Sequence, residues 1–191
     1  YFEPLPNCNV GALGSRSLFC GQVGGTYVYQ SQIGDLSLLG HYNPALQYDR
    51  VEDTVIDMSS HDNKVAVYMQ SSAIYYDTTL SQLVNAIDYS SVESEGSSQI
   101  GAMPVLTIPN PQYISKSVGM LCRGAICKTE DGYDAFITQN KGLVVFDGFK
   151  LSGNLLAGRI MNKMTPLQSQ IAMMYTKRFG VLLWGTKNNL M

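Results

Sequence analysis

Apolar and polar positions alternate most regularly in the last part of the chain, over residues 169–184. Ile171, Met173 and Tyr175 fall on every second position, which is the period of a strand with one buried face. Gly180 interrupts the pattern as a bulge or bend does, and the apolar run 181–184 continues it. The pattern predicts one long strand, central to a sheet that earlier segments complete.

Residues 44–58 show helical spacing. Asn43 suits the N-cap, and Pro44 suits the first helical position. Four apolar residues then recur at intervals of three or four, with acidic residues between them. They are Tyr48, Val51, Val55 and Met58. We therefore expect a first helix over 44–58.

Residues 79–87 show the same period after a stronger start signal. Thr79 and Gln82 have the spacing of a capping box. A single apolar stripe follows, formed by Leu80, Leu83, Val84 and Ile87. We expect a second helix here, with its stripe packed on strands at 64–70 and 102–108.

Short apolar runs bounded by turn residues predict several further strands. The run 64–70 reads as a buried strand, and 102–108 as a strand that opens at Pro104 or lies at an edge. Other short strands are expected at 26–29, 124–128, 133–138 and 143–146, with turns at Asp131-Gly132 and Lys141-Gly142. Residues 1–25, rich in Gly and Pro, and residues 151–165 are expected to form loops.

This order of elements predicts an α+β fold with mixed or antiparallel sheets, two short helices and a long C-terminal strand. We divide the chain into a loop-rich N-terminal segment at 1–43, an α+β domain at 44–165, and a last region at 166–191 that contributes its long strand to a separate sheet.

The composition of the chain allows two interpretations of its surface. Hydrophobic residues make up 45% of the 191 positions and charged residues only 15%, against about 25% in a typical globular domain. The low charge fits a surface covered by other subunits, or a neutral surface rich in Tyr and Ser. A net charge of −2 argues against a dedicated nucleic-acid binder. Neither a membrane-spanning run nor a signal peptide is apparent, and because the chain begins at Tyr1 we expect a processed product or a piece of something longer.

The sequence carries no catalytic, cofactor-binding or metal-binding signature. His41 and His61 are the two histidines, and neither has a second ligand at metal spacing. The spacing of the four cysteines matches no zinc or redox motif, so we expect free thiols, with a bridge between Cys122 and Cys127 as the alternative. We therefore predict that the protein is not an enzyme and needs no cofactor.

Two cations in the expected final strand are the candidate assembly contacts. Lys177 and Arg178 are consecutive, so a strand places one on each face of the sheet. One of them is expected to reach a partner or a carboxylate. The plainer alternative is that the two charges only keep the surface soluble.

From residue 44 onward the order of segments resembles the C-terminal part of a tailed-phage major capsid protein. In that family, a helix like 44–58 leads to a strand like 64–69, a small helix like 79–87 and a strand of Gly-x-Pro-Val type, here 99–106. The family ends on a long strand of the kind Tyr-x-x-Arg-Phe-Gly-Val, matched by residues 175–181. Residues 1–40 match nothing in the family.

The resemblance implies a structural virion protein, a subunit of an icosahedral shell that self-assembles around the genome. Residues 44–165 then form the domain at the capsomer axis, and residues 166–191 belong to the peripheral domain. The implied partners are copies of the chain in pentamers or hexamers, together with other virion proteins, and the implied location is the virion, assembled in the host cytoplasm. The alternatives are a tail or connector protein, and a soluble enzyme or binding module with an unrecognised pocket.

Overall fold

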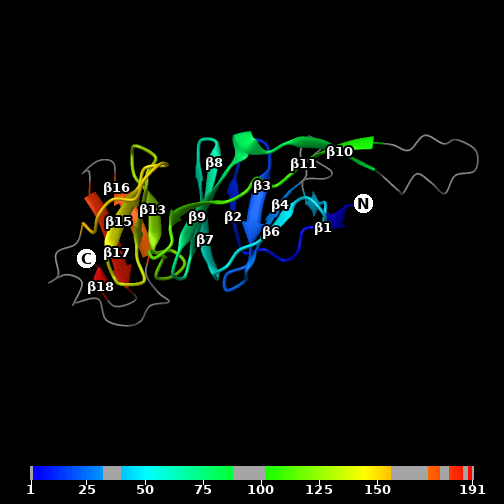
Figure 1. The fold of residues 1–191 in the computed structure, drawn as a ribbon. Coiled ribbons are helices and arrows are strands. Elements are labelled where there is room, and N and C mark those ends of the chain that lie inside the picture. The colour runs from blue at the N-terminus through cyan, green and yellow to red at the C-terminus, as the bar shows by residue number, and fades with distance from the viewer. Residues whose placement is uncertain are drawn as a thin grey trace, which may run out of the picture.

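The protein is built almost wholly of antiparallel sheet, so the predicted α+β class is wrong (Figure 1). The computed structural model describes residues 2–31, 40–87, 102–155, 172–176, 181–186 and 189–190. Within these ranges every paired strand runs antiparallel to its neighbour, and the helical structure is one 3-10 turn, η2 (Thr78–Leu80).

The first sheet forms where loops were expected. Its four strands follow one another as a meander: β2 (Val10–Leu13), β3 (Leu18–Gly21), β4 (Tyr27–Gln30) and β6 (Tyr48–Arg50). A small ribbon beside it pairs β1 (Glu3–Pro4) with β5 (His41–Tyr42). Strand β2 alternates buried Val10 and Ala12 with exposed Gly11 and Leu13, but four residues between glycines and prolines are too few for the period to stand out. The expectation that 1–25 is loop is therefore wrong.

The second sheet lies next to the first and has the strand order β12-β9-β8-β7. Its strands are β7 (Val55–His61), β8 (Lys64–Met69), β9 (Ala73–Asp77) and β12 (Gln112–Ser115). Between β9 and β12 the chain leaves the sheet as a separate two-stranded ribbon of β10 (Leu83–Ile87) and β11 (Ala102–Leu106). Figure 1 shows this ribbon running past the first sheet.

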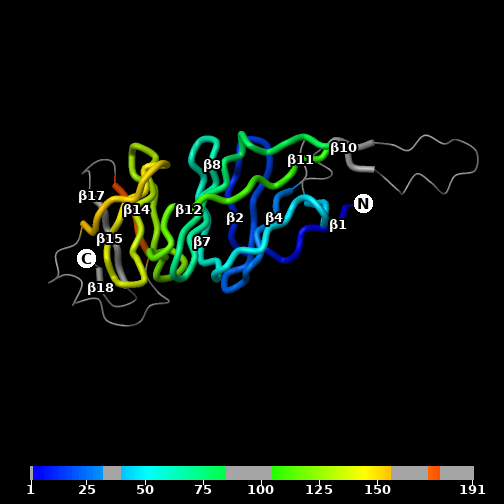
Figure 2. The backbone as a smooth tube through the Cα atoms, in the orientation of Figure 1, coloured from blue at the N-terminus to red at the C-terminus, as the bar shows by residue number. Residues whose placement is uncertain are grey.

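Two further sheets complete the described part of the chain. One contains β13 (Ile126–Lys128), β14 (Asp134–Ile137) and β15 (Leu143–Phe146), and the other contains β16 (Ala172–Thr176), β17 (Val181–Thr186) and β18 (Asn189–Leu190). The first three sheets succeed one another in a row from the N-terminal end, as the tube in Figure 2 shows, and β16 of the fourth sheet contacts β13 of the third. The arrangement is sandwich-like.

The predicted helix at 44–58 is replaced by a turn and parts of two strands, β6 and β7. Asn43 does cap a turn, since its side chain accepts from Ala45 N at 2.9 Å, but the turn goes no further than Gln47. The carboxylate of Asp53 then accepts from the backbone N–H groups of Thr54 and Ser71, which favours an irregular corner over a helix. Val51, Val55 and Met58 are buried as expected, but in extended backbone.

The predicted helix at 79–87 is also wrong. The residue that caps the short η2 turn is Asp77, and the chain then extends into β10. Leu80 and Leu83 are 54% and 60% exposed, so the proposed stripe is not packed on the neighbouring strands. Pairing of Leu83 with Leu106 and of Val84 with Val105 in the ribbon overrides the local helical pattern.

The predicted long C-terminal strand is a hairpin. β16 and β17 pair antiparallel, with Met173 opposite Trp184 and Thr176 opposite Val181. Both arms of a hairpin have period two, so the alternation alone does not show that the chain reverses. Lys177 and Arg178, the candidate assembly contacts, lie outside the described residues.

Several local predictions are confirmed. Strands form within or close to the predicted segments at 26–29, 64–70, 102–108, 124–128, 133–138 and 143–146. Gly132 and Lys141 have φ of 79° and 62°, as the two predicted turns require. Pro104 lies in the two-stranded ribbon, where each strand is an edge. The division of the chain at residues 43 and 165 stays a prediction.

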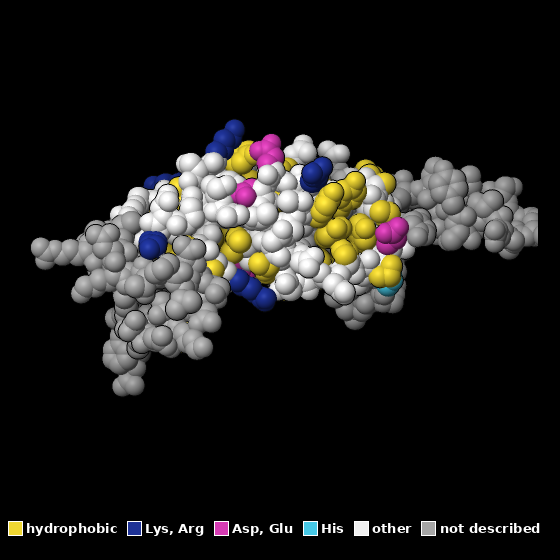
Figure 3. All heavy atoms as spheres, turned by 90° about the horizontal axis from the view of Figure 1, so that it is seen from below, with side chains coloured by type: hydrophobic (Ala, Val, Ile, Leu, Met, Phe, Trp, Pro, Cys, Tyr) yellow, Lys and Arg dark blue, Asp and Glu magenta, His cyan; other side chains and the backbone are white. Residues whose placement is uncertain are grey.

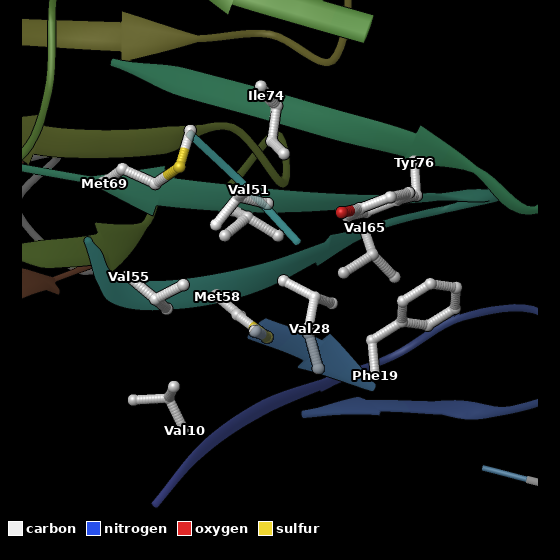
Figure 4. Close-up of a cluster of buried hydrophobic side chains, with 12 residues drawn as sticks. Val10, Phe19, Val28, Val51, Val55, Met58, Val65, Met69, Ile74 and Tyr76 are labelled. Atoms are coloured by element: carbon white, nitrogen blue, oxygen red, sulfur yellow. The ribbon is translucent and has the colours of Figure 1, made fainter. Parts of the chain in front are cut away.

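Two hydrophobic cores lie on opposite faces of the second sheet. Strand β8 directs Val65, Val67 and Met69 into the core shared with the first sheet (Figure 4). Its intervening residues, Ala66 and Tyr68, enter the core shared with the third sheet. The second sheet therefore lies between the two cores, and its strand β8 is buried on both faces, which explains the nearly continuous apolar sequence of that strand.

Candidate functional site

A buried carboxylate joins the second and third sheets. Asp134, on β14, is fully buried. Its Oδ2 accepts a hydrogen bond from Tyr68 at 2.6 Å and lies 2.6 Å from Nε2 of His61, while Oδ1 accepts from Ser59 and Lys128, each at 2.8 Å. Ser59 and His61 belong to β7, Tyr68 to β8 and Lys128 to β13. Four side chains from three strands thus meet at the carboxylate of a fourth.

The partners of Asp134 keep it ionised. Burial raises the pKa of Asp134, but hydrogen bonds and charge from His61, Lys128 and Tyr68 outweigh it, so the pKa is lowered. Burial, and then the carboxylate itself, raise the pKa of Tyr68 well above the usual value, so its hydroxyl stays a donor. The same two causes raise the pKa of Cys127 to about 11.

The Asp134 centre is a structural junction by its geometry. Nζ of Lys128 also donates to the carbonyl oxygens of Ser60 and Gly132, so its three N–H groups have three oxygen acceptors. Both oxygens of Asp134 are likewise occupied. A substrate would have to displace these contacts, so the arrangement holds two sheets in register.

The four cysteines are free thiols, so the alternative bridge between Cys122 and Cys127 does not form. Burial and the neighbouring Cys8 raise the pKa of Cys20. With the raised pKa of Cys127, this keeps two of the four as unreactive thiols at neutral pH.

A second feature is the outer face of the first sheet, opposite its core. Tyr29 and Tyr48 are direct cross-strand partners, and Tyr27 lies within 6.3 Å of Tyr29 and 6.1 Å of Tyr48 between ring centroids. Tyr42 from β5 adds an edge-to-face contact with Tyr29 at 5.2 Å. We call these four tyrosines, with Leu13 of β2, the tyrosine face.

The tyrosine face is apolar and open to solvent. Leu13 is 66% exposed, Tyr27 40% and Tyr48 44%. Figure 3 shows hydrophobic side chains gathered over the end of the molecule that carries the first sheet. A sheet with one solvated face normally alternates apolar with polar residues, and here three outward positions of β4 and β6 carry aromatic rings, with Arg50 opposite Tyr27. Large exposed apolar patches are typical of interaction sites.

Neither feature was predicted from the sequence. The sequence offered His61 no second ligand at metal spacing and no other partner, whereas its side chain is 7% exposed and lies against Asp134. The two residues are 73 positions apart, and no local pattern links them. The other histidine, His41, lies on β5. Among the described residues, no group of three or more His, Cys, Asp or Glu side chains is placed to hold a metal ion.

The fold and these features define a class: an antiparallel β protein of stacked sheets with an exposed aromatic face. No family model matches the chain, and no curated protein matches it. A solved structure that it resembles is the extracellular domain of the putative hybrid two component system BT4673 from B. thetaiotaomicron, at 17% identity and a TM-score of 0.35. The match covers 96% of this chain and 26% of that one, and a TM-score this low carries no argument. No helix in the described ranges has the length and apolar character needed to cross a membrane.

Proposed function

We propose that this chain is a structural subunit that works by binding other subunits through its tyrosine face, and not by catalysis. The observation that carries the proposal is the exposure of Leu13, Tyr27 and Tyr48 on one sheet face. Tyrosine and other aromatic residues are enriched at protein interfaces, since a ring buries a large area at a small entropy cost.

The packing of the other sheets supports this proposal. The second sheet is covered on both faces, by the first and third sheets. A further sheet or a second copy laid on the tyrosine face would extend the same face-to-face packing, with sheets about 10 Å apart. The partners that we propose are copies of this chain and other structural proteins.

The setting that we propose is a virion, on the strength of the sequence resemblance. The family pattern includes helices like 44–58 and 79–87, and these segments form turns and strands here. We therefore propose a component other than the shell, such as a tail or connector protein, ahead of a capsid-shell subunit. Lys177 and Arg178 stay proposed ionic contacts between subunits.

The size of the purified protein in solution tests the tyrosine face. We expect the wild-type chain to associate as its concentration rises, measured by size-exclusion chromatography with light scattering. The double variant Tyr27→Ser, Tyr48→Ser is expected to shift toward monomer, because it removes two exposed rings from the centre of the face. Circular dichroism checks that the variant is folded.

The matched control is Tyr133→Ser, which removes a 39% exposed tyrosine away from this face. It should associate like the wild type. A wild-type chain that stays monomeric at every concentration, or a control that behaves like the double variant, would contradict the proposal. Electron microscopy of the associated species tests the virion setting: rings, tubes or particles support it, and a small closed dimer speaks against it.

A further inference from the structure

Two of the four cysteines lie side by side at one edge of the first sheet. Cys20 is on β3, opposite Gly11 of β2 and Tyr29 of β4. Cys8 lies two residues before β2 begins. Both cysteines line a pocket of about 480 Å³, whose other walls come from the start of β2, the start of β3 and the segment that leads to β2 from β1. The thiol of Cys20 donates a hydrogen bond to Cys8, so the two side chains meet in this pocket.

The backbone beside Cys8 is held against β3. The N–H of Asn9 donates to the carbonyl oxygen of Gly21 at 3.0 Å, and the side-chain oxygen of Asn9 accepts a backbone N–H of the turn after β3 at 2.8 Å. A Cβ added at Gly11 would lie 3.5 Å from Cβ of Cys20. Because Gly11 has no side chain, the space beside Cys20 stays open to Cys8.

The two thiols differ in their access to solvent. Cys8 is half-buried, whereas Cys20 is 3% exposed. Burial, followed by the hydrogen bond and the charge of Cys8, raises the pKa of Cys20. A reagent from solvent therefore reaches Cys8 first, and Cys20 reacts as its intramolecular partner. A thiol with a raised pKa is also a poor leaving group, so a disulfide that includes Cys20 resists reduction at that sulfur.

We propose that Cys8 and Cys20 are a modification site, which a small disulfide oxidant such as oxidised glutathione converts to an intramolecular disulfide. The Cys8 thiol loses its proton to solvent, and its thiolate attacks one sulfur of the oxidant. The disulfide bond of the oxidant breaks, and one glutathione thiolate leaves and takes up a proton. Cys20 loses its proton in turn, attacks the sulfur of Cys8 and expels the second glutathione. The two protein thiols lose two electrons and two protons, and the oxidant gains both as it becomes two thiols.

The disulfide closes the loop from residue 8 to residue 20 and ties the connection between β1 and β2 to the first sheet. β1 pairs with β5, which carries Tyr42 of the tyrosine face. The oxidised protein therefore holds this small ribbon more firmly than the reduced protein does. Formation of the bridge needs no partner subunit, so its test is separate from that of the proposed function.

Peptide mapping without reduction tests this site. The folded protein is equilibrated with reduced and oxidised glutathione, free thiols are blocked with N-ethylmaleimide, and the chain is cut with trypsin. Cleavage after Arg16 separates the two cysteines, so the bridge appears as peptide 1–16 linked to peptide 17–50. We expect this linked pair to be the main disulfide product, with Cys122 and Cys127 blocked by the maleimide.

Three controls distinguish the native geometry from random oxidation. The variant Cys122→Ala, Cys127→Ala keeps the proposed pair and should give the same linked peptides. Cys8→Ala removes the half-buried thiol, and it should leave the buried Cys20 without attached glutathione. In concentrated urea the same treatment of the wild type should give mixed pairings among the four cysteines.

Thermal unfolding supplies a second measurement. The bridged wild type is expected to melt roughly 5 °C or more above the reduced protein, because the bridge restricts the unfolded chain. Cys8→Ala should show no such dependence on the oxidant. The proposal is overturned if both cysteines remain blocked thiols in oxidised glutathione alone, if Cys8 stops at the mixed disulfide, or if folded and unfolded protein give the same pairings. An unchanged melting temperature in a bridged protein would contradict the firmer hold on the ribbon.

Discussion

At the scale of single residues, the complete burial of the Asp134 carboxylate most needs an explanation. An ionised carboxylate without solvent contact is costly unless charged partners and hydrogen bonds compensate it. Here Tyr68, Ser59 and His61 supply them from the second sheet, and Lys128 supplies the charge from β13, beside Asp134 in the third sheet. The carboxylate therefore stabilises the junction of two sheets only while every partner is in place.

Replacing Asp134 with Asn should lower the free energy of unfolding by about 3 kcal/mol, since it leaves Lys128 beside a neutral group. Urea unfolding at pH 7 measures the loss, and Asp131→Asn, an exposed neighbour in sequence, is the control. A loss under about 0.5 kcal/mol would show that the junction contributes nothing to stability.

The free energy of unfolding of the same variant should also depend less on acid pH than that of the wild type. The pKa of Asp134 is lower in the folded than in the unfolded chain, so its stabilisation is complete above about pH 4. That stabilisation disappears as the pH falls through the lowered folded value. The stability difference between wild type and Asp134→Asn is therefore expected to shrink below pH 4, and a constant difference down to pH 2 would contradict this.

Sequence alone could not reveal this centre. The partners of Asp134 on β7 and β8 lie between 66 and 75 positions away in the chain. Each is an ordinary polar residue in its own segment, and only the packing of two sheets brings them together. Tyr27 and Tyr29 fell in a predicted strand, but Tyr48 was assigned to the predicted helix at 44–58, and which face the three occupy depends on register and on the position of the core.

At the scale of elements, burial was easier to predict than backbone conformation. Val51, Val55 and Met58 are buried, although the helix that they indicated is absent. Spacings of three and four also arise by chance where two short strands meet at a corner, as around Asp53. The buried strand at 64–69 was predicted correctly because its apolar run is continuous and β-branched.

Close approach between elements is the basis of another prediction. A Cβ on Gly119 would lie 2.4 Å from both the carbonyl oxygen of Met69 and the carbonyl carbon of Gln70, which are backbone atoms. Gly119→Ala must therefore move the end of β8 and is expected to cost about 3 kcal/mol. Gly153→Ala, with nothing within 4 Å of the added Cβ, is the control and should change stability by less than about 0.5 kcal/mol. Equal effects in thermal unfolding would contradict the close contact.

At the scale of the whole molecule, the central sheet couples two cores. Residues 65 and 67 enter one core and residues 66 and 68 the other, so neither core can be lost without disturbing β8. We expect one cooperative unfolding transition for the sheets that share β8.

Variants in the two cores test this coupling. Phe19→Ala and Phe136→Ala each remove a fully buried ring, one from each core, and should each cost about 3–5 kcal/mol. Both should move the same transition, followed by near- and far-UV circular dichroism. Two separate transitions, each affected by only one variant, would show that the cores unfold independently.

The ribbon of β10 and β11 has a consequence for how the protein can diversify. β9 pairs directly with β12, while β10 and β11 pair with each other. The strand pairing of the second sheet therefore does not depend on the ribbon. Related proteins can lengthen, shorten or replace this ribbon while every strand pairing of the central sheet is kept. New specificity can therefore evolve there without redesign of the scaffold.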